Sequence, residues 1–172
     1  MGKVVFYGAI SLDGYLADQE DDLTWLFETD TGVQTTYEAF FETIDATFMG
    51  RKTYQEAKKL LSGAFLYPEK ENYVCSTTLI EPLPDATIIK EDPVTFLRAH
   101  QDQNIWVVGG GQLLQPILEA DLIDEWYIQI APVLLGAGKR LFQEGTYLSR
   151  LQLEDTTQMG QLMELHYIRA AN

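Results

Sequence analysis

The chain has 172 residues, of which 46% are hydrophobic and 12% are aromatic. A globular chain of this length buries roughly two-thirds of its unfolded surface, so we expect one domain over residues 1–172. Twelve Lys and Arg against 26 Asp and Glu give a formal net charge of -14, which repels nucleic acid phosphates and anionic lipids. Because no basic cluster offsets this charge, we expect neither nucleic acid nor a membrane as a partner.

The single cysteine, Cys75, leaves no internal disulfide and fits a reducing cytosol. The opening residues, MGKVVFYGAI, are too short and too strand-like for a signal peptide, and no apolar run reaches the ~20 residues of a membrane span. These features predict a soluble, cytoplasmic protein.

The first part of the chain alternates apolar strands with helical patterns. Residues 3–10 form an apolar run that predicts a buried strand, and residues 11–25 contain an Asp-Gly turn signal and an acidic run typical of a loop. Apolar residues at helical spacing follow, namely Tyr37, Phe40, Phe41 and Ile44. A short strand over 46–50 then leads into a helix over 51–61.

The middle of the chain repeats this alternation. We predict strands over 72–76 and 86–90, and then a helix over 92–101 that an Asp-Pro pair opens as N-cap and first helical residue. An apolar run over 104–110 predicts another buried strand.

The last third begins with a helix over 112–120 that contains Pro116, which has no N–H and should weaken or bend it. A strand over 125–135 and a loop over 136–142 come next. Two strands close the chain, at residues 151–156 and 161–170.

This alternation predicts an α/β fold of three layers, in which helices cover both faces of a mostly parallel sheet. No helix separates the two closing strands, so we expect an antiparallel pairing at that C-terminal edge of the sheet.

Two segments run an apolar strand into glycine and then into a helix: FMGRKTY at residues 48–54 and VVGGGQL at residues 107–113. In α/β sheets, ligands bind where the carboxyl ends of strands lead into helices. There the first N–H groups of a helix favour a phosphate, and glycine allows close backbone approach. The first of these helix starts also carries Arg51, Lys52 and the Thr53 hydroxyl.

Each turn also has a purely structural explanation, because glycine commonly serves backbone geometry between a strand and a helix. The GGGQ segment lacks the G-x-G-x-x-G fingerprint, and no P-loop Gly-Lys-Ser/Thr follows it. The residues alone therefore allow two ordinary turns or two backbones that approach one ligand.

Other side chains give little support for metal or thiol chemistry. His100 and His166 lack metal-ligand spacing, so we expect no metal site. Cys75 lies in a predicted buried strand, where a core role is favoured over that of a nucleophile.

Taken in order, six segments resemble the dihydrofolate reductase superfamily, most closely the bacterial branch related to the reductase domain of riboflavin biosynthesis. The segments are AISLDGYLA, DLTWL, FMGRKTY, YVCST, IWVVGGGQLLQPIL and DEWYIQIAPVLLGAGKRLF, and they span most of the chain. The resemblance implies a dihydrofolate-reductase-like fold with a mainly parallel central sheet, an NADPH cofactor and a homodimer.

In this family both glycine turns contact the same dinucleotide, so the resemblance implies cofactor-binding roles for residues of both. It places the 2′-phosphate toward Arg51 and Lys52 and the nicotinamide toward Ala9 and Leu16. Core packing is the alternative for Leu16 and Leu113. The full set implied for NADPH comprises Ala9, Leu16, Gly50, Arg51, Lys52, Thr53, Ser76, Thr77, Lys90, Gly109, Gly110, Gly111, Gln112 and Leu113.

The resemblance also assigns Asp22 of DLTWL as the substrate-pocket carboxylate, which binds the substrate ring and helps to deliver the proton that accompanies hydride transfer. Burial among Leu23, Trp25 and Leu26 would raise the pKa of Asp22 and suit that role. The alternatives are a solvated loop position, an N-cap, or a shift of the role to Asp21.

The chain departs from true dihydrofolate reductases at substrate-binding positions. Lys70 matches the arginine whose fork grips the glutamate carboxylate of folate, and lysine offers only a point charge. Leu26 matches an aromatic residue beside the pteridine, and Gln129 matches a threonine that supports the carboxylate. These differences disfavour folate and favour the riboflavin-reductase branch.

We therefore predict an NADPH-dependent reductase that transfers a hydride to a small heterocyclic substrate, pteridine- or pyrimidine-like, or to a carbonyl substrate. Asp22, Leu26 and Gln129 form the expected substrate site. True dihydrofolate reduction is the second hypothesis, and a dinucleotide-binding module without catalysis is the third.

Overall fold

The computed structural model describes residues 1–171. The strands of its main sheet are β1 (Val4–Ser11), β3 (Ala46–Gly50), β4 (Glu71–Cys75), β5 (Thr87–Ile89), β6 (Ile105–Gly109), β7 (Glu125–Ala131), β9 (Leu151–Met159) and β10 (Leu162–Arg169). Two short strands pair separately, β2 (Tyr15–Ala17) and β8 (Lys139–Arg140). The helices are α1 (Thr24–Phe27), α2 (Tyr37–Glu42), α3 (Arg51–Leu60), α4 (Pro93–Ala99) and α5 (Gly111–Glu119).

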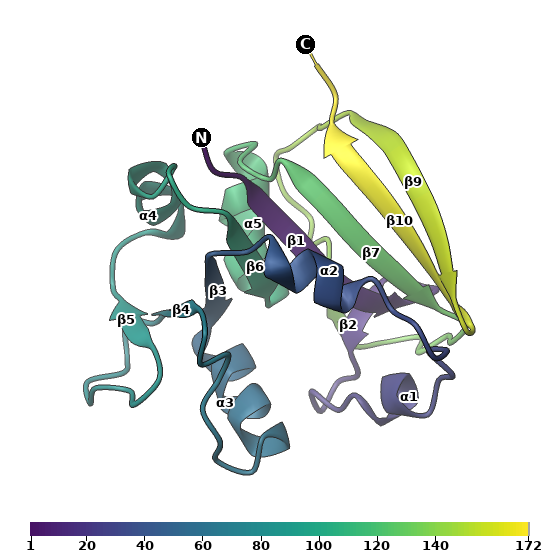
Figure 1. Cartoon of the computed structure of the whole chain (residues 1–172), viewed down its shortest axis with the longest axis horizontal. Helices are drawn as coiled ribbons and strands as arrows, with labels where there is room; N and C mark the ends of the chain where they lie inside the picture. The colour runs from purple at the N-terminus through teal and green to yellow at the C-terminus, as the bar shows by residue number, and fades with distance from the viewer. Residues whose placement is uncertain (172) are drawn as a thin grey trace.

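The main sheet has the strand order β5-β4-β3-β6-β1-β7-β10-β9 (Figure 1). All pairings from β5 to β7 are parallel, whereas β10 is antiparallel to both β7 and β9. The two closing strands form a hairpin because only the turn residues Gly160 and Gln161 separate them. This arrangement confirms the predicted α/β fold, with a mostly parallel sheet and an antiparallel C-terminal edge.

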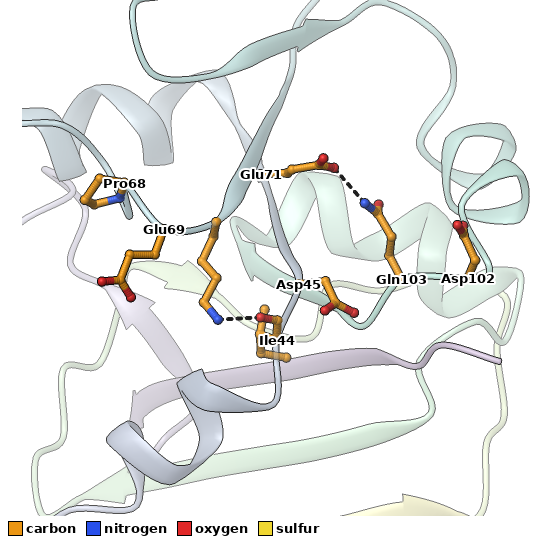
Figure 2. Close-up of a pocket in the computed structure, with 8 residues that line it drawn as sticks. Ile44, Asp45, Pro68, Glu69, Glu71, Asp102 and Gln103 are labelled. Carbon is orange, nitrogen blue, oxygen red and sulfur yellow. Dashed lines mark hydrogen bonds between the residues drawn. The ribbon is translucent and has the colours of Figure 1, made fainter.

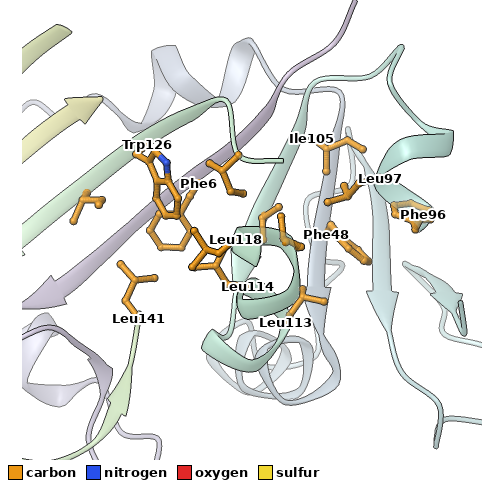
Figure 3. Packing of buried hydrophobic residues seen from close by; sticks show 14 of the residues in the cluster. Phe6, Phe48, Phe96, Leu97, Ile105, Leu113, Leu114, Leu118, Trp126 and Leu141 are labelled. Carbon is orange, nitrogen blue, oxygen red and sulfur yellow. The ribbon is translucent and has the colours of Figure 1, made fainter. Parts of the chain in front are cut away.

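Helices α4 and α5 cover one face of the sheet, and alternation within the strands explains why. Along β1, Phe6 points toward α5, into a cluster of fully buried side chains that includes Phe48, Phe96 and Leu114 (Figure 3). Truncation of one such aromatic residue to alanine typically costs about 3–5 kcal/mol. This cluster fixes the centre of the sheet, from which both glycine turns leave.

The opposite face of the sheet is covered by α2 and α3. Phe40 of α2 packs against Val5 and Trp106, and Tyr54 of α3 packs against Met49. Figure 1 shows α2 crossing in front of the sheet, on the side opposite α5. Helices therefore lie on both faces, as predicted.

Some element boundaries differ from those predicted. The predicted loop over 11–25 contains β2 and the start of α1, the loop over 136–142 contains β8, and the strand over 151–156 continues to Met159. The strand over 125–135 ends at Ala131, because Pro132 has no N–H to donate to a ladder. Helix α5 continues through Pro116, held by four buried side chains on the sheet.

Candidate functional site

The two glycine turns lie next to each other at the carboxyl ends of β3 and β6. Met49 pairs with Gly109 across these neighbouring strands. A Cβ atom built on Gly50 would lie 3.9 Å from the carbonyl oxygen of Gly109, and one built on Gly110 would lie 3.7 Å from Thr53 Oγ1. The fold thus brings together two segments that are about sixty residues apart in the sequence, as the sheet order requires.

Both helices that leave these turns begin without a side-chain cap. Gly50 is the N-cap of α3 and Gly110 that of α5, and neither helix has an acidic residue in its first turn. Among the helices of residues 1–171, only α4 has a side-chain cap: the Asp92 carboxylate accepts from the Thr95 N–H at 3.0 Å. The free N–H groups and positive dipole ends of α3 and α5 therefore converge on one place, which suits an anion.

The glycines of the two turns fall into two kinds. Cβ atoms added at Gly50 or Gly110 would make only ordinary contacts, and one added at Gly109, where φ is +132°, would meet no atom within 4 Å. A Cβ atom at Gly111 would lie 2.5 Å from the Arg140 carbonyl oxygen. Gly111 is thus required by packing and Gly109 by its positive φ, while Gly50, Gly109 and Gly110 border space that a ligand can approach.

Three basic side chains lie at this edge of the sheet, and Lys90 is two strands away from the nearer glycine turn. Arg51 and Lys52 are exposed in the first turn of α3, and Lys90 is exposed directly after β5. Within residues 1–171, none of the three takes part in an ion pair. Cations that remain unpaired in a chain with 26 acidic residues are available for an anionic ligand.

Hydroxyl groups follow β4 at the same edge of the sheet. Ser76 is buried, and its Oγ accepts from the Leu79 N–H at 3.2 Å, which shapes the loop after the strand. Thr77 is exposed. Because β4 lies beside β3, these residues belong to the same end of the sheet as Arg51 and Lys52.

The remaining residues proposed for cofactor binding have mixed surroundings. Leu113 is buried in the core cluster beneath α5, and Leu16 packs half-buried against the same cluster. Gln112 is exposed in the first turn of α5, and Ala9 is half-buried near the carboxyl end of β1. The packing of Leu16 and Leu113 thus fits the core alternative as well as a binding role.

Asp22 does not have the environment expected of it. The residue is exposed, and its Oδ1 accepts from the Thr24 N–H at 2.8 Å and from the Thr24 hydroxyl at 2.7 Å. These hydrogen bonds lower the pKa of Asp22, so the expectation of a raised pKa was wrong. Trp25 and Leu26 pack on the sheet, and the Trp25 indole N–H donates to the Asp22 carbonyl oxygen at 3.1 Å. The Asp22 carboxylate therefore stays in solvent at the start of α1.

Gln129 lies in a buried polar network on the α2 face of the sheet. Its Nε2 donates to Glu164 Oε2 at 2.5 Å, and the Thr36 hydroxyl donates to the same oxygen at 2.7 Å. The Tyr7 hydroxyl lies 2.9 Å from Thr36 Oγ1, and burial, with a contribution from Glu164, raises the pKa of Tyr7 to about 12. Ala9, Gln129 and Glu164 are in register on β1, β7 and β10.

Glu164 was not among the residues singled out from the sequence. The available signal is its position in LMELHYI, where a charged residue occupies an inward-facing place in an alternating strand. The pattern alone does not identify the hydrogen-bond partners of Glu164, because Gln129 and Thr36 come from distant parts of the chain.

A hollow of about 600 Å³ lies at the opposite, amino-terminal end of the sheet. Figure 2 shows that its lining includes four carboxylates, those of Asp45, Glu69, Glu71 and Asp102. Lys70 also lines it, but its Nζ donates to the Ile44 carbonyl oxygen at 2.6 Å and lies 4.7 Å from the centre of the Phe41 ring. This hollow therefore does not suit an anionic ligand.

Within residues 1–171, no group of three or more His, Cys, Asp or Glu side chains is arranged to hold a metal ion. The same part of the chain contains no helix with the length and apolar character needed to span a membrane.

Comparison with known proteins places the chain in a family. Residues 2–165 match the model of the RibD C-terminal domain. The Bacillus subtilis (strain 168) protein YwjB is 37% identical over 177 residues, which cover 98% of each chain. The crystal structure of a putative riboflavin biosynthesis protein from Shewanella sp. PV-4 shares 31% identity and a TM-score of 0.83, over 99% of this chain and 100% of that one.

The fold is also shared with a more distant enzyme. Dihydrofolate reductase from Enterococcus faecalis, in a complex with NADP(H), superimposes with a TM-score of 0.69 over 99% of this chain and 98% of the other. At 13% identity, this likeness shows the fold alone.

Proposed function

Since the chain belongs to the RibD C-terminal domain family, we propose that it is an NADPH-dependent reductase that transfers a hydride to a small heterocyclic or carbonyl substrate. NADPH supplies the hydride when it is bound, and the protein supplies binding, orientation and a proton route. A cytoplasmic location is part of the proposal, supported by the lone free thiol of Cys75.

The convergence of two uncapped helix starts at one edge of the sheet carries this proposal. The pyrophosphate would bind to the N–H groups at the starts of α3 and α5, close to Gly50 and Gly110. Arg51 and Lys52 would bind the 2′-phosphate that distinguishes NADPH from NADH. The other proposed contacts are the Thr53, Ser76 and Thr77 hydroxyls, Lys90 beside the adenosine, Gly109, Gly111, Gln112 and Leu113 near the pyrophosphate, and Ala9 and Leu16 toward the nicotinamide.

Folate is a poor candidate substrate for this chain. Lys70, the counterpart of the folate-gripping arginine, already donates to a backbone carbonyl group and faces a hollow rich in carboxylates. A glutamate tail placed there would meet like charge, which is destabilising. The riboflavin-reductase-like activity is therefore preferred to dihydrofolate reduction.

The substitution Gly50→Ala separates a ligand role from a structural one. Gly50 has an extended backbone, with φ of -78°, and an added Cβ atom would meet only one atom within 4 Å, at 3.9 Å. We expect the free energy of unfolding to stay within about 1 kcal/mol of wild type. We expect NADPH to bind roughly tenfold or more weakly, a loss of about 1.4 kcal/mol, because the methyl group occupies the place of closest approach.

Titration calorimetry and urea unfolding of the same samples measure both effects. Gly111→Ala is the contrasting variant, since its Cβ atom would collide with a carbonyl oxygen and lower stability by about 1–3 kcal/mol. If Gly50→Ala binds NADPH as tightly as the wild type does, the turns are structural and the proposed cofactor site is wrong.

We further propose that the protein is a homodimer. The supporting observation is a C-terminal apolar surface in which each large side chain is at least 38% exposed, made of Phe142, Leu148, Leu151 and Leu153. Three of these residues line a groove above Trp126. In Figure 1 no helix lies over β9 and β10, and exposed apolar surfaces of this kind mark sites of association.

A further inference from the structure

Glu164 is a buried carboxylate without a cation. Its exposed fraction is 2%, and within residues 1–171 no Lys, Arg or His side chain forms an ion pair with it. Acidic residues are almost never fully buried unless they are paired, because the loss of hydration is costly. A carboxylate retained at such a position points to a role other than stability.

The two oxygens of Glu164 are used unequally. Oε2 accepts both available hydrogen bonds, from Gln129 and Thr36, while Oε1 accepts none from residues 1–171. In the same part of the chain, every fully enclosed side-chain nitrogen or oxygen has a hydrogen-bond partner. Oε1 is therefore not fully enclosed, and its lone pairs are free to accept a hydrogen bond.

This oxygen lies on the side of the sheet where the nicotinamide is proposed to bind. Glu164 and Ala9 flank Gln129 in register, so two strand spacings, roughly 10 Å, separate their backbones. Aromatic and apolar side chains lie near Glu164. The Tyr7 hydroxyl contacts Thr36, which donates to Glu164, and Trp25 and Leu26 pack in the cluster that contains the neighbouring Leu162.

We propose that Glu164, rather than Asp22, supplies the carboxylate of the substrate site, and that its Oε1 accepts from an N–H donor at the edge of a flat ring. Amidines and amino-substituted nitrogen heterocycles carry such N–H donors at their edge, and a cationic donor forms a charge-assisted hydrogen bond with the free oxygen, Oε1. The inference rests on the proposed function, because it places this edge beside a nicotinamide.

Glu164 also excludes negatively charged parts of a substrate from its surroundings. A phosphate or carboxylate group of the substrate would meet the negative charge of Glu164 at close range, which is unfavourable in a buried site. Any anionic part must therefore point away from β10.

The variant Glu164→Gln tests the proposal with little change in shape. The glutamine carbonyl oxygen can still accept from Gln129 and Thr36, while the free oxygen becomes an NH2 group that cannot accept. Binding is measured by titration in saturating NADPH with three probes of one shape: benzamidine, which has cationic N–H donors, benzamide and benzoate. Glu154→Gln, an exposed residue of β9, is the matched control.

We expect the wild type to bind benzamidine at least tenfold more tightly than benzamide and not to bind benzoate. In Glu164→Gln, the affinity for benzamidine relative to benzamide should fall by roughly tenfold or more, as expected for the loss of a charge-assisted hydrogen bond. The melting temperature of the variant should be at or above that of the wild type. Should the variant fold poorly, NMR of 13C-labelled glutamate carboxyl groups in the wild type replaces it, and benzamidine should shift the Glu164 signal.

The possible failures are distinct. Absence of NADPH binding to the wild type would overturn the proposed function, and this inference with it. Three results with intact NADPH binding would overturn the inference alone. These are a wild type that shows no preference for benzamidine, a Glu164→Gln variant that keeps that preference, and an Asp22→Asn variant that loses it instead. An unshifted Glu164 carboxyl signal would do the same.

Discussion

Among single residues, Asp13 joins the two loops that border the proposed nicotinamide side of the site. Its carboxylate accepts from the Ser11 hydroxyl at 2.6 Å and from the Leu135 and Gly136 N–H groups at 3.1 and 2.8 Å. The Ser11 hydrogen bond, followed by those from the backbone, lowers the pKa of Asp13 to about 2. The turn after β1 is thereby fixed to the segment after β7.

This pKa shift predicts a pH dependence of stability. A folded-state pKa near 2, below the unfolded value of about 3.9, means that the contribution of Asp13 is present above pH 4 and is lost as the pH falls toward 2. We expect Asp13→Asn to lower the melting temperature at pH 7, and the difference from wild type to shrink between pH 4 and pH 2. A difference that does not change with pH would show that the loops do not depend on the charge.

The contrast between Asp22 and Glu164 shows what residue patterns could and could not predict. The resemblance of DLTWL assigned the substrate-pocket carboxylate to Asp22, but the environment of this residue depends on where α1 turns its side chains, which no short pattern specifies. Glu164 becomes a candidate only when the antiparallel return of β10 sets it beside Gln129. The glycine turns were predictable because strand, glycine and helix follow one another directly in the sequence.

Among the elements, α3 is the one that the proposed phosphate site depends on most, and a buried polar cluster fixes it. Asp85 accepts from Lys58 at 2.7 Å, from the Tyr54 hydroxyl at 2.5 Å and from the Leu66 N–H at 2.7 Å. Its side chain is 2% exposed. One carboxylate thus ties the helix to the segments on either side of β4.

Loss of this carboxylate should be costly. We expect Asp85→Ala to lower the free energy of unfolding by about 3 kcal/mol, because Lys58 and the Tyr54 hydroxyl would lose their buried partner. Urea unfolding measures the change. Glu56→Ala removes the exposed pair with Lys59 on the same helix and should change stability by no more than about 0.5 kcal/mol. Equal effects of the two substitutions would contradict the buried role of Asp85.

The long elements were predictable from pattern, and the short ones were not. Continuous apolar runs such as those of β1 and β6 identify buried parallel strands, and the antiparallel end followed from the missing helix between the last strands. Strands β2 and β8 and helix α1 have two to four residues each, too few to show a period. Their positions follow from tertiary contacts, including Tyr15 against Arg140.

At the scale of the whole molecule, the proposed dimer depends on the C-terminal apolar surface. We expect light scattering to give a mass of about twice 19.5 kDa for the wild type, and half of that for a variant with Leu148→Lys and Leu153→Lys, because charges cannot be buried in an apolar interface. Leu60→Lys, at a leucine of α3 that is 61% exposed, is the control and should remain dimeric. A monomeric wild type would contradict the proposal.

The charge distribution of the molecule bears on the proposal that NADPH binds at the two glycine turns. A chain with a net charge of -14 repels a dinucleotide phosphate in general, yet it keeps Arg51 and Lys52 unpaired beside two uncapped helix starts. Attraction must therefore be local, and it should weaken as salt screens these cations.

Calorimetric titration of the wild-type protein with NADPH and, in parallel, with NADH tests this claim most directly. The account predicts that both dinucleotides bind to one site per chain, and that NADPH binds roughly tenfold or more tightly because only it carries the 2′-phosphate near Arg51 and Lys52. Binding of neither dinucleotide would mean that the two glycine turns meet for structural reasons alone. Equal affinity for both would contradict the role assigned to the two cations.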